Sequence, residues 1–77
     1  MPPSTEARYL TALKRLQTHV SLMEEMARWK EDLRSRLWRA TVVLRATGSP
    51  LYDVQELEDE VALYGEIVRK LEEKNDA

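Results

Sequence analysis

The sequence lacks cysteine altogether, so neither disulfide bonds nor thiolate metal sites can stabilise the chain. It has only two glycines and no glycine-rich stretch, which excludes a phosphate-binding loop. Its apolar runs, such as residues 42–44, are far shorter than the stretch of about 20 residues that spans a bilayer. The N-terminal residues lack the basic and then apolar regions of a secretory signal. We therefore expect no membrane association and a cytoplasmic location.

Histidine is almost absent as well, because His19 is the only one. The di-metal sites of helical bundles need a glutamate followed three residues later by a histidine on two helices, and the sequence contains no such pair. The serines have no histidine base that the sequence identifies, so a serine nucleophile is not indicated. We therefore predict no catalytic, cofactor-binding or metal-binding residue, no cofactor, no small-molecule substrate and a non-enzymatic role.

The composition that remains is typical of a small helical protein. Charged residues make up 34% of the 77 residues and apolar residues 43%, with a formal net charge of -2. A chain of this length buries only about 60% of the surface that it exposes when unfolded, so it is marginally stable alone. Because disulfides are excluded and no metal site is indicated, self-association is the remaining common way to stabilise it.

Residues 4–46 predict one long helix, because they contain no glycine or proline and are rich in Leu, Arg, Glu, Met and Ala. Ser4 or Thr5 can cap its start. Residues 47–50 predict a turn, in which Gly48 can adopt the left-handed conformation that ends a helix. A second helix is predicted from about residue 50 to about residue 73, with Ser49 or Asp53 as its cap. Residues 74–77 should fray.

The second helix carries one apolar seam at steps of three and four residues, formed by Val54, Leu57, Val61, Tyr64, Val68 and Leu71. Because the turn is short, the two helices should pack as antiparallel neighbours. The seam then faces a stripe on the long helix formed by Leu22, Met26, Trp29, Leu33, Leu37, Ala40 and Leu44. The prediction is an all-α protein, with one antiparallel helical-hairpin domain over residues 1–77.

The long helix also carries a second apolar stripe, which lies about 120° around its axis from the first. This stripe comprises Tyr9, Leu13, Leu16, Val20, Met23 and Ala27, and Trp38 and Val43 continue it. The second helix is only about half as long as the first and cannot cover the overhanging part. Leaving the stripe in water costs on the order of 25 cal/mol per Å² of apolar area.

Three arrangements would cover the second stripe. The first is a homodimer of hairpins, which forms an antiparallel four-helix bundle or a coiled coil. The second is a different helical protein partner, and the third is a bent first helix that folds back to give a three-helix monomer. We expect the homodimer, because two-fold self-association is the commonest route for small chains and no glycine or proline offers a break in residues 4–46.

The second stripe also predicts the function. Its eight residues are the candidate protein-interface residues, and Trp38 is the candidate hot spot because large aromatic side chains dominate interface energies. An apolar helix face of this kind suits a homo-oligomeric assembly factor, an adaptor, or a small chaperone that covers an apolar segment of a client.

The uneven distribution of charge offers an alternative function. Residues 1–46 hold nine basic and five acidic residues, a net +4, and residues 47–77 hold three and nine, a net -6. The arginine-rich half could serve a small nucleic-acid-binding regulator of the antitoxin or phage-regulator type. However, its basic residues point in several directions, and Glu24, Arg28, Asp32 and Arg36 alternate in sign, which is typical of a self-paired helix face. We therefore favour a protein partner over nucleic acid.

Two single residues complete the sequence-based expectations. Gly65 falls in the middle of the second helix, where glycine costs up to about 1 kcal/mol relative to alanine. A close approach of another segment would explain it, but we favour a position without special function. His19 is expected to be a partly buried or surface residue and not a ligand.

Overall fold

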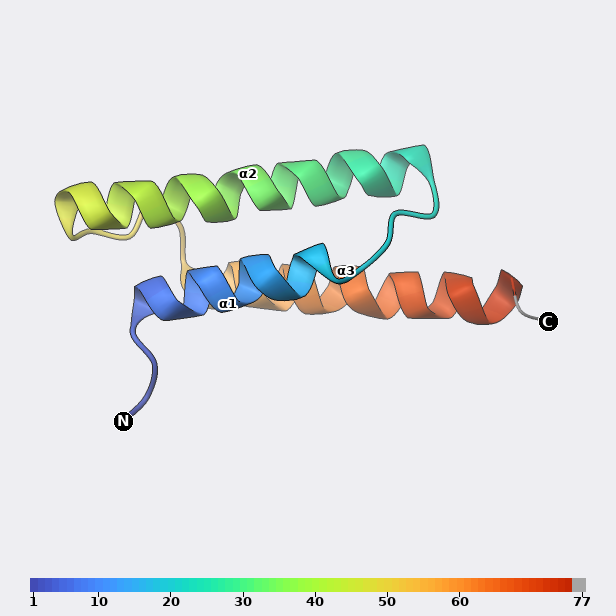
Figure 1. The fold of residues 1–77 in the computed structure, drawn as a ribbon, viewed down its shortest axis with the longest axis horizontal. Helices are drawn as coiled ribbons and strands as arrows, with labels where there is room; N and C mark the ends of the chain where they lie inside the picture. Colours follow the sequence, from blue (N-terminus) through green and yellow to red (C-terminus); the bar gives the residue numbers. More distant parts are fainter. Residues whose placement is uncertain (76–77) are drawn as a thin grey trace.

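The computed structural model describes residues 1–75, which form three α-helices and no strand (Figure 1). The helices are α1 (Thr5–Gln17), α2 (Glu24–Thr47) and α3 (Val54–Asn75). The all-helical class is therefore confirmed, whereas the two-helix hairpin is wrong. Of the tail that was expected to fray, Lys74 and Asn75 belong to α3, and Asp76 and Ala77 lie outside the described residues.

The single helix expected over residues 4–46 is broken between Gln17 and Glu24. The chain leaves the helix at Thr18, whose hydroxyl donates to the Arg15 carbonyl at 2.7 Å, and α2 begins after the connection of residues 18–23. Thr18 and Val20 are β-branched and have lower helix propensity than the flanking residues. The break lets α1 fold back and bury Tyr9 and Leu16 completely. The bent first helix, the third of the arrangements considered above, is thus the one that this chain adopts.

Two of the three helices begin with a side-chain cap. Ser4 accepts a hydrogen bond from the backbone N–H of Ala7 at 3.1 Å, as expected from the sequence. Asp53 accepts one from the backbone N–H of Gln55 at 3.1 Å, so α3 begins four residues later than the expected residue 50. Gly48 ends α2 with φ of 74°, which confirms the left-handed C-terminal conformation.

The helices α2 and α3 run antiparallel, and α1 lies against both of them, antiparallel to α2 (Figure 1). One core joins the three helices. Its largest fully buried side chains are Tyr9, Leu16, Leu33, Leu37, Thr41, Val61, Tyr64 and Val68. The helix α1 is much shorter than α2 and α3, so the start of α2 and the end of α3 extend past its last residue, Gln17. The connection of residues 18–23 lies along this part of the two longer helices.

Contacts with α2 and α3 hold the connection of residues 18–23 in place. The imidazole of His19 lies against Gly65, and the hydroxyls of Ser21 and Tyr64 share a hydrogen bond of 3.1 Å. The Lys30 ammonium donates to the His19 carbonyl. The expectation that Gly65 has no special function is therefore wrong, because the His19 ring packs closely against it. Among the described residues, no helix combines the length and the apolar content needed to cross a membrane.

Candidate protein interface

Two of the eight candidate interface residues lie inside the chain. Tyr9 and Leu16 are fully buried, and α2 and α3 supply the surfaces that cover them. Their assignment to an interface between chains is therefore corrected: the bent chain covers them itself. Leu13 packs against the same core and is partly buried, and Val43 is half-buried on α2.

The other four candidates are exposed. Trp38 is 48% exposed, Val20 53% and Met23 49%, and Ala27 is exposed on the first turns of α2. Trp29 differs from Trp38, because its ring packs edge-on against Tyr64 with 5.1 Å between ring centroids. The structure thus divides the second stripe into an inner part on α1 and outer parts on α2 and the connection.

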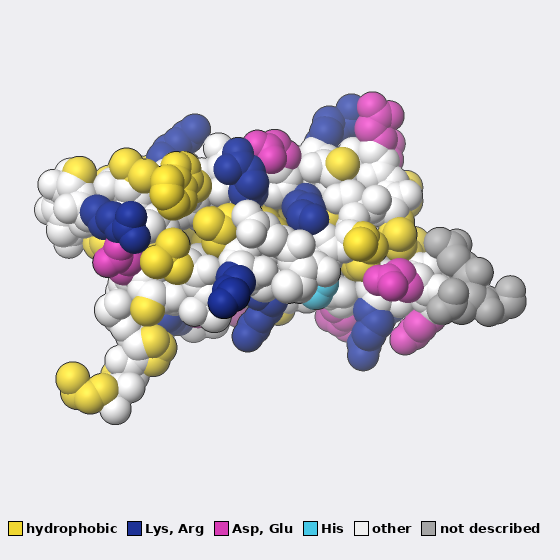
Figure 2. All heavy atoms as spheres, in the orientation of Figure 1, with side chains coloured by type: hydrophobic (Ala, Val, Ile, Leu, Met, Phe, Trp, Pro, Cys, Tyr) yellow, Lys and Arg dark blue, Asp and Glu magenta, His cyan; other side chains and the backbone are white. Residues whose placement is uncertain are grey.

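Trp38 belongs to an apolar surface where α1 and α2 meet. Val42, one helical turn after Trp38, is 45% exposed. The ion pair Glu6–Arg45 fixes the register of α1 against α2, so that Leu10 and Leu13 lie at the level of Val42 and Trp38. Figure 2 shows hydrophobic side chains gathered over this half of α2 and its border with α1. We call the four residues Leu10, Leu13, Trp38 and Val42 the Trp38 surface.

Charged side chains at both ends of the Trp38 surface are already paired. Arg34, one turn before Trp38, donates to Glu31 at 2.8 Å. Arg45, three residues after Val42, is bound by Glu6. The surface therefore has an apolar centre with two neutralised arginines at its ends, whereas Arg39, three residues before Val42, is exposed and forms no ion pair within the described residues. An apolar centre with a charged rim is the usual anatomy of a protein-binding patch.

A second exposed apolar group lies on the connection between α1 and α2. It consists of Val20, Leu22 and Met23, and Leu22 is 37% exposed. Figure 2 shows hydrophobic atoms at this end of the molecule, separate from those of the Trp38 surface. We call these three residues the connection patch.

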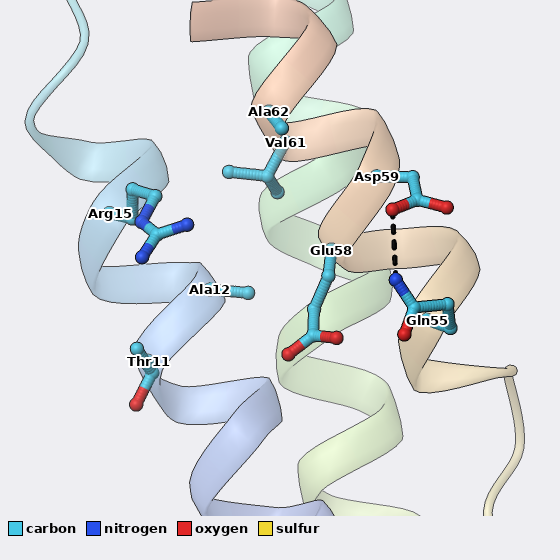
Figure 3. A pocket seen from close by; sticks show the side chains of 8 residues that line it. All are labelled: Thr11, Ala12, Arg15, Gln55, Glu58, Asp59, Val61 and Ala62. Atoms are coloured by element: carbon cyan, nitrogen blue, oxygen red, sulfur yellow. Dashed lines mark hydrogen bonds between the residues drawn. The ribbon is translucent and has the colours of Figure 1, made fainter.

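A groove of about 320 Å³ lies between α1 and α3 (Figure 3). Its walls combine apolar and charged side chains of both signs: Thr11, Ala12, Arg15, Gln55, Glu58, Asp59, Val61 and Ala62. Arg15 acts on Glu58 across it and helps to lower the pKa of that carboxyl. Because the opposite charges face one another, the groove offers no selective attraction to an anion or to a cation.

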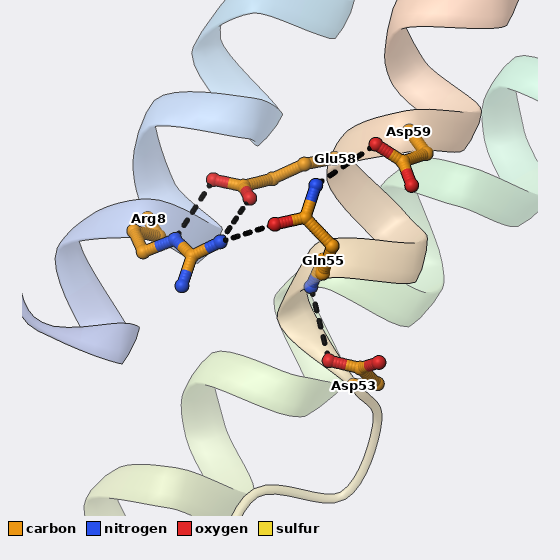
Figure 4. Close-up of polar contacts among 5 residues, drawn as sticks. All are labelled: Arg8, Asp53, Gln55, Glu58 and Asp59. Atoms are coloured by element: carbon orange, nitrogen blue, oxygen red, sulfur yellow. Dashed lines mark hydrogen bonds and ion pairs between the residues drawn. The ribbon is translucent and has the colours of Figure 1, made fainter.

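A polar network beside this groove links α1 to α3 (Figure 4), and Gln55, Glu58 and Asp59 belong to both. The Arg8 guanidinium forms a two-pronged pair with Glu58 and donates to the Gln55 side chain at 3.2 Å. The hydrogen bonds from Arg8 hold the pKa of Glu58 below its ordinary value. Gln55 in turn donates to Asp59 at 2.9 Å. These contacts position α1 on α3, which gives the network a structural role.

The arrangement of the arginines bears on the nucleic-acid alternative. Within the described residues, Arg8, Arg28, Arg34, Arg36 and Arg45 each pair with a carboxylate of the same chain. Arg36, for example, is held between Asp32 and Glu60. Paired arginines are less available to phosphates, whereas Lys14, Arg15 and Arg39 are exposed and form no ion pair within the described residues. Within residues 1–75, no three His, Asp or Glu side chains are placed together so that they could hold a metal ion.

Comparison with known proteins gives no relative: no family model matches the chain, and no curated protein or solved structure matches it significantly. The candidate interface therefore depends on the geometry alone.

Sequence reasoning missed two members of the Trp38 surface. Val42 follows Trp38 by four residues, and this spacing could have identified it. Leu10 could not be found in the same way, because it reaches the surface only when α1 folds back against α2. Leu63 on α3 is also 48% exposed, but it lies outside both apolar groups.

Proposed function

We propose that this chain is a non-enzymatic protein-interaction module that binds another protein through the Trp38 surface. The observation that carries the proposal is the half-exposed Trp38 beside an exposed Val42. Leaving these side chains in water costs free energy that a docked partner would recover. A tryptophan at the centre of an apolar patch is the residue type that contributes most to binding in measured interfaces.

The expected partner is an amphipathic helix that lays its apolar face along the seam between α1 and α2. Two helices side by side offer a shallow groove, and helix-in-groove docking uses anchors at steps of three and four residues. The rim pairs Glu6–Arg45 and Glu31–Arg34 neutralise two of the arginines beside the patch. The contact is therefore expected to depend on apolar burial more than on charge, and to be insensitive to moderate salt. An adaptor or a small chaperone would bind an apolar helix of its client in this way.

The test is a comparison of captured proteins between matched variants. Immobilised wild-type chain, Trp38→Ser, Val42→Ser and Leu63→Ser are exposed to the same cell extract, and the bound proteins are compared by mass spectrometry. Leu63 is the control because it is as exposed as Trp38 but lies on α3. A binding partner should be retained by the wild type and by Leu63→Ser and lost from both variants of the Trp38 surface. Equal retention by all four chains would contradict the proposal.

The nucleic-acid alternative is tested separately. Duplex and single-stranded DNA are titrated into the chain at low and at moderate salt. We expect no binding at either salt concentration. Binding that strengthens steeply as the salt concentration is lowered would instead support the nucleic-acid alternative.

A further inference from the structure

The helix break between α1 and α2 has an unusual sequence, because nothing in residues 18–23 forbids a helix. The connection contains no glycine and no proline. The apolar residues also keep the same phase on both sides of it: Tyr9, Leu13, Leu16, Val20, Met23 and Ala27 follow one another at alternating steps of four and three. Such a spacing defines one continuous face on an unbroken helix. The sequence is therefore compatible with a second state in which α1 and α2 form one helix.

The start of α2 supports this second state. Met23 occupies the N-cap position and makes no side-chain capping hydrogen bond, whereas Ser4 and Asp53 cap α1 and α3. A helix start without a cap leaves backbone N–H groups without a partner from the chain, and these would be satisfied if the helix continued upstream. Among the starts of α1, α2 and α3, that of α2 therefore differs in having no side-chain capping hydrogen bond.

The broken state also leaves apolar side chains in water at the break. Val20 is 53% exposed, Met23 is 49% exposed, and Leu22 lies beside them. The face formed by the alternating residues is thus buried where it lies on α1 and exposed where it crosses the connection. A state that buries the face both on α1 and on the connection would gain the free energy of removing the connection patch from water.

We propose that the chain also forms a domain-swapped homodimer, in which α1 and α2 of each copy join into one helix and α1 of each copy occupies the groove between α2 and α3 of the other. The geometry allows this exchange, because α1 runs antiparallel to α2 (Figure 1). The Glu6–Arg45 pair sets the register, so the two-fold axis that relates the two straightened helices lies beside the first turn of α2, between Glu25 and Met26. With this axis, α1 of the second copy enters the groove in the same direction as in the single chain.

The swap preserves the contacts that hold α1. Tyr9 and Leu16 fill the same core, and Arg8 meets Glu58, with each pair now formed between two chains. What changes is the connection: its six residues join a helix and give up the contacts of His19 with Gly65 and of Ser21 with Tyr64. The two connection patches then lie close to the two-fold axis. The proposal does not depend on the proposed function, because the Trp38 surface lies farther along α2 and remains exposed in both states.

The first test is the molar mass of the chain refolded at micromolar and at millimolar concentration, measured by light scattering during gel filtration. The wild type should give the 9.0 kDa monomer at low concentration and a stable population of twice that mass at high concentration. A wild-type chain that remains monomeric after refolding at millimolar concentration would overturn the proposal.

Variants of the connection should move this equilibrium in opposite directions. Met23→Asp supplies the missing cap to α2 in the monomer only, where α2 has a free start. Each dimer dissociates into two such monomers, so the substitution should raise the dissociation constant about tenfold or more. Thr18→Ala with Ser21→Ala raises helix propensity and removes the Ser21–Tyr64 hydrogen bond, so it should lower that constant. Leu63→Asp and Thr11→Ala are the controls, because they make similar changes away from the connection and should leave the dimer unaffected.

The second test distinguishes an exchanged α1 from a side-by-side dimer. One chain carries Arg8→Cys and another carries Glu58→Cys, and these are the only thiols because the sequence has no cysteine. After the two chains are refolded together at millimolar concentration, a short bis-maleimide should join them to one another. A dimer in which these two positions do not cross-link between chains would refute the exchange, whereas loss of partner binding in Trp38→Ser would leave it unaffected.

Discussion

The imidazole ring of His19 lies directly against the backbone of Gly65, so that a β-carbon at position 65 would come within 2.5 Å of the His19 Nε2 atom. This contact joins the connection between α1 and α2 to the middle of α3. It explains why a helix interior carries glycine, although glycine there costs about 0.5–1 kcal/mol relative to alanine. The close approach requires a residue without a side chain.

Gly65→Ala should therefore not stabilise the protein in the way that it stabilises an ordinary helix. In the wild-type background, the gain in helix propensity is offset by displacement of His19, and we expect an unchanged or lower free energy of unfolding. In a His19→Ala background the space is free, and Gly65→Ala should raise that free energy by about 0.5–1 kcal/mol. Urea unfolding of the four chains measures the coupling. The same gain in both backgrounds would contradict the contact.

The position of the helix break shows where sequence reasoning reached its limit. The caps at Ser4 and Gly48 could be predicted because each depends on a few adjacent residues. The break at residues 18–23 could not, because its residues are only mildly unfavourable in a helix. It is explained by contacts with distant residues, such as His19 on Gly65 and Tyr9 beneath α2 and α3. Tertiary packing here overrides a local preference for helix.

The candidate interface was predictable only in part, for a related reason. The spacing of Tyr9, Leu13 and Leu16 identifies an apolar face but not the surface that covers it. Once α1 folds back, that face becomes core, and the exposed patch shifts to Trp38 and Val42. Helical periodicity therefore identified residues that need cover, whereas the fold decides which of them another protein can reach.

Stability should depend on pH through Glu58. The hydrogen bonds from Arg8 lower the pKa of this carboxyl in the folded state. Its contribution is fully present above the unfolded pKa, near 4.3 on the usual scale, and is lost as pH falls through the lower folded value. Thermal unfolding followed by circular dichroism should show that Glu58→Gln lowers the melting temperature at neutral pH and weakens its decline below about pH 4.

Glu31→Gln is the matched control for this pH dependence. Glu31 also has a lowered pKa, because Arg34 donates to it, but both residues lie on the exposed side of α2. Exposed pairs within one helix contribute little. Glu31→Gln should therefore change the melting temperature much less than Glu58→Gln, and an equal effect of the two substitutions would contradict the role of Arg8 and Glu58 in docking α1.

The hydroxyl of Tyr9 should contribute to stability through one hydrogen bond. Tyr9 is fully buried, and its hydroxyl donates to the backbone carbonyl of Tyr52 in the connection between α2 and α3. Tyr9→Phe removes the donor and leaves that carbonyl without it, which should lower the free energy of unfolding by about 0.5–1.5 kcal/mol. Tyr52→Phe keeps the carbonyl and is the control. Urea unfolding should show a clearly smaller change for the control, and equal losses would argue against the hydrogen bond.

Truncation of Leu16 should destabilise the protein more than truncation of Trp38, although the sequence placed them in one stripe. Leu16 is fully buried, so Leu16→Ala leaves a cavity in the core and should lower the free energy of unfolding by about 2–5 kcal/mol. Trp38 is half-exposed, and Trp38→Ala should cost less than Leu16→Ala, because about half of its surface is already in water and its removal leaves no enclosed cavity. Chemical unfolding of the isolated chain at low concentration separates the two, since no second copy can then cover either residue. A small loss for Leu16→Ala together with weakened association would return Leu16 to an interface between chains and would contradict the packing of α1 on α2 and α3.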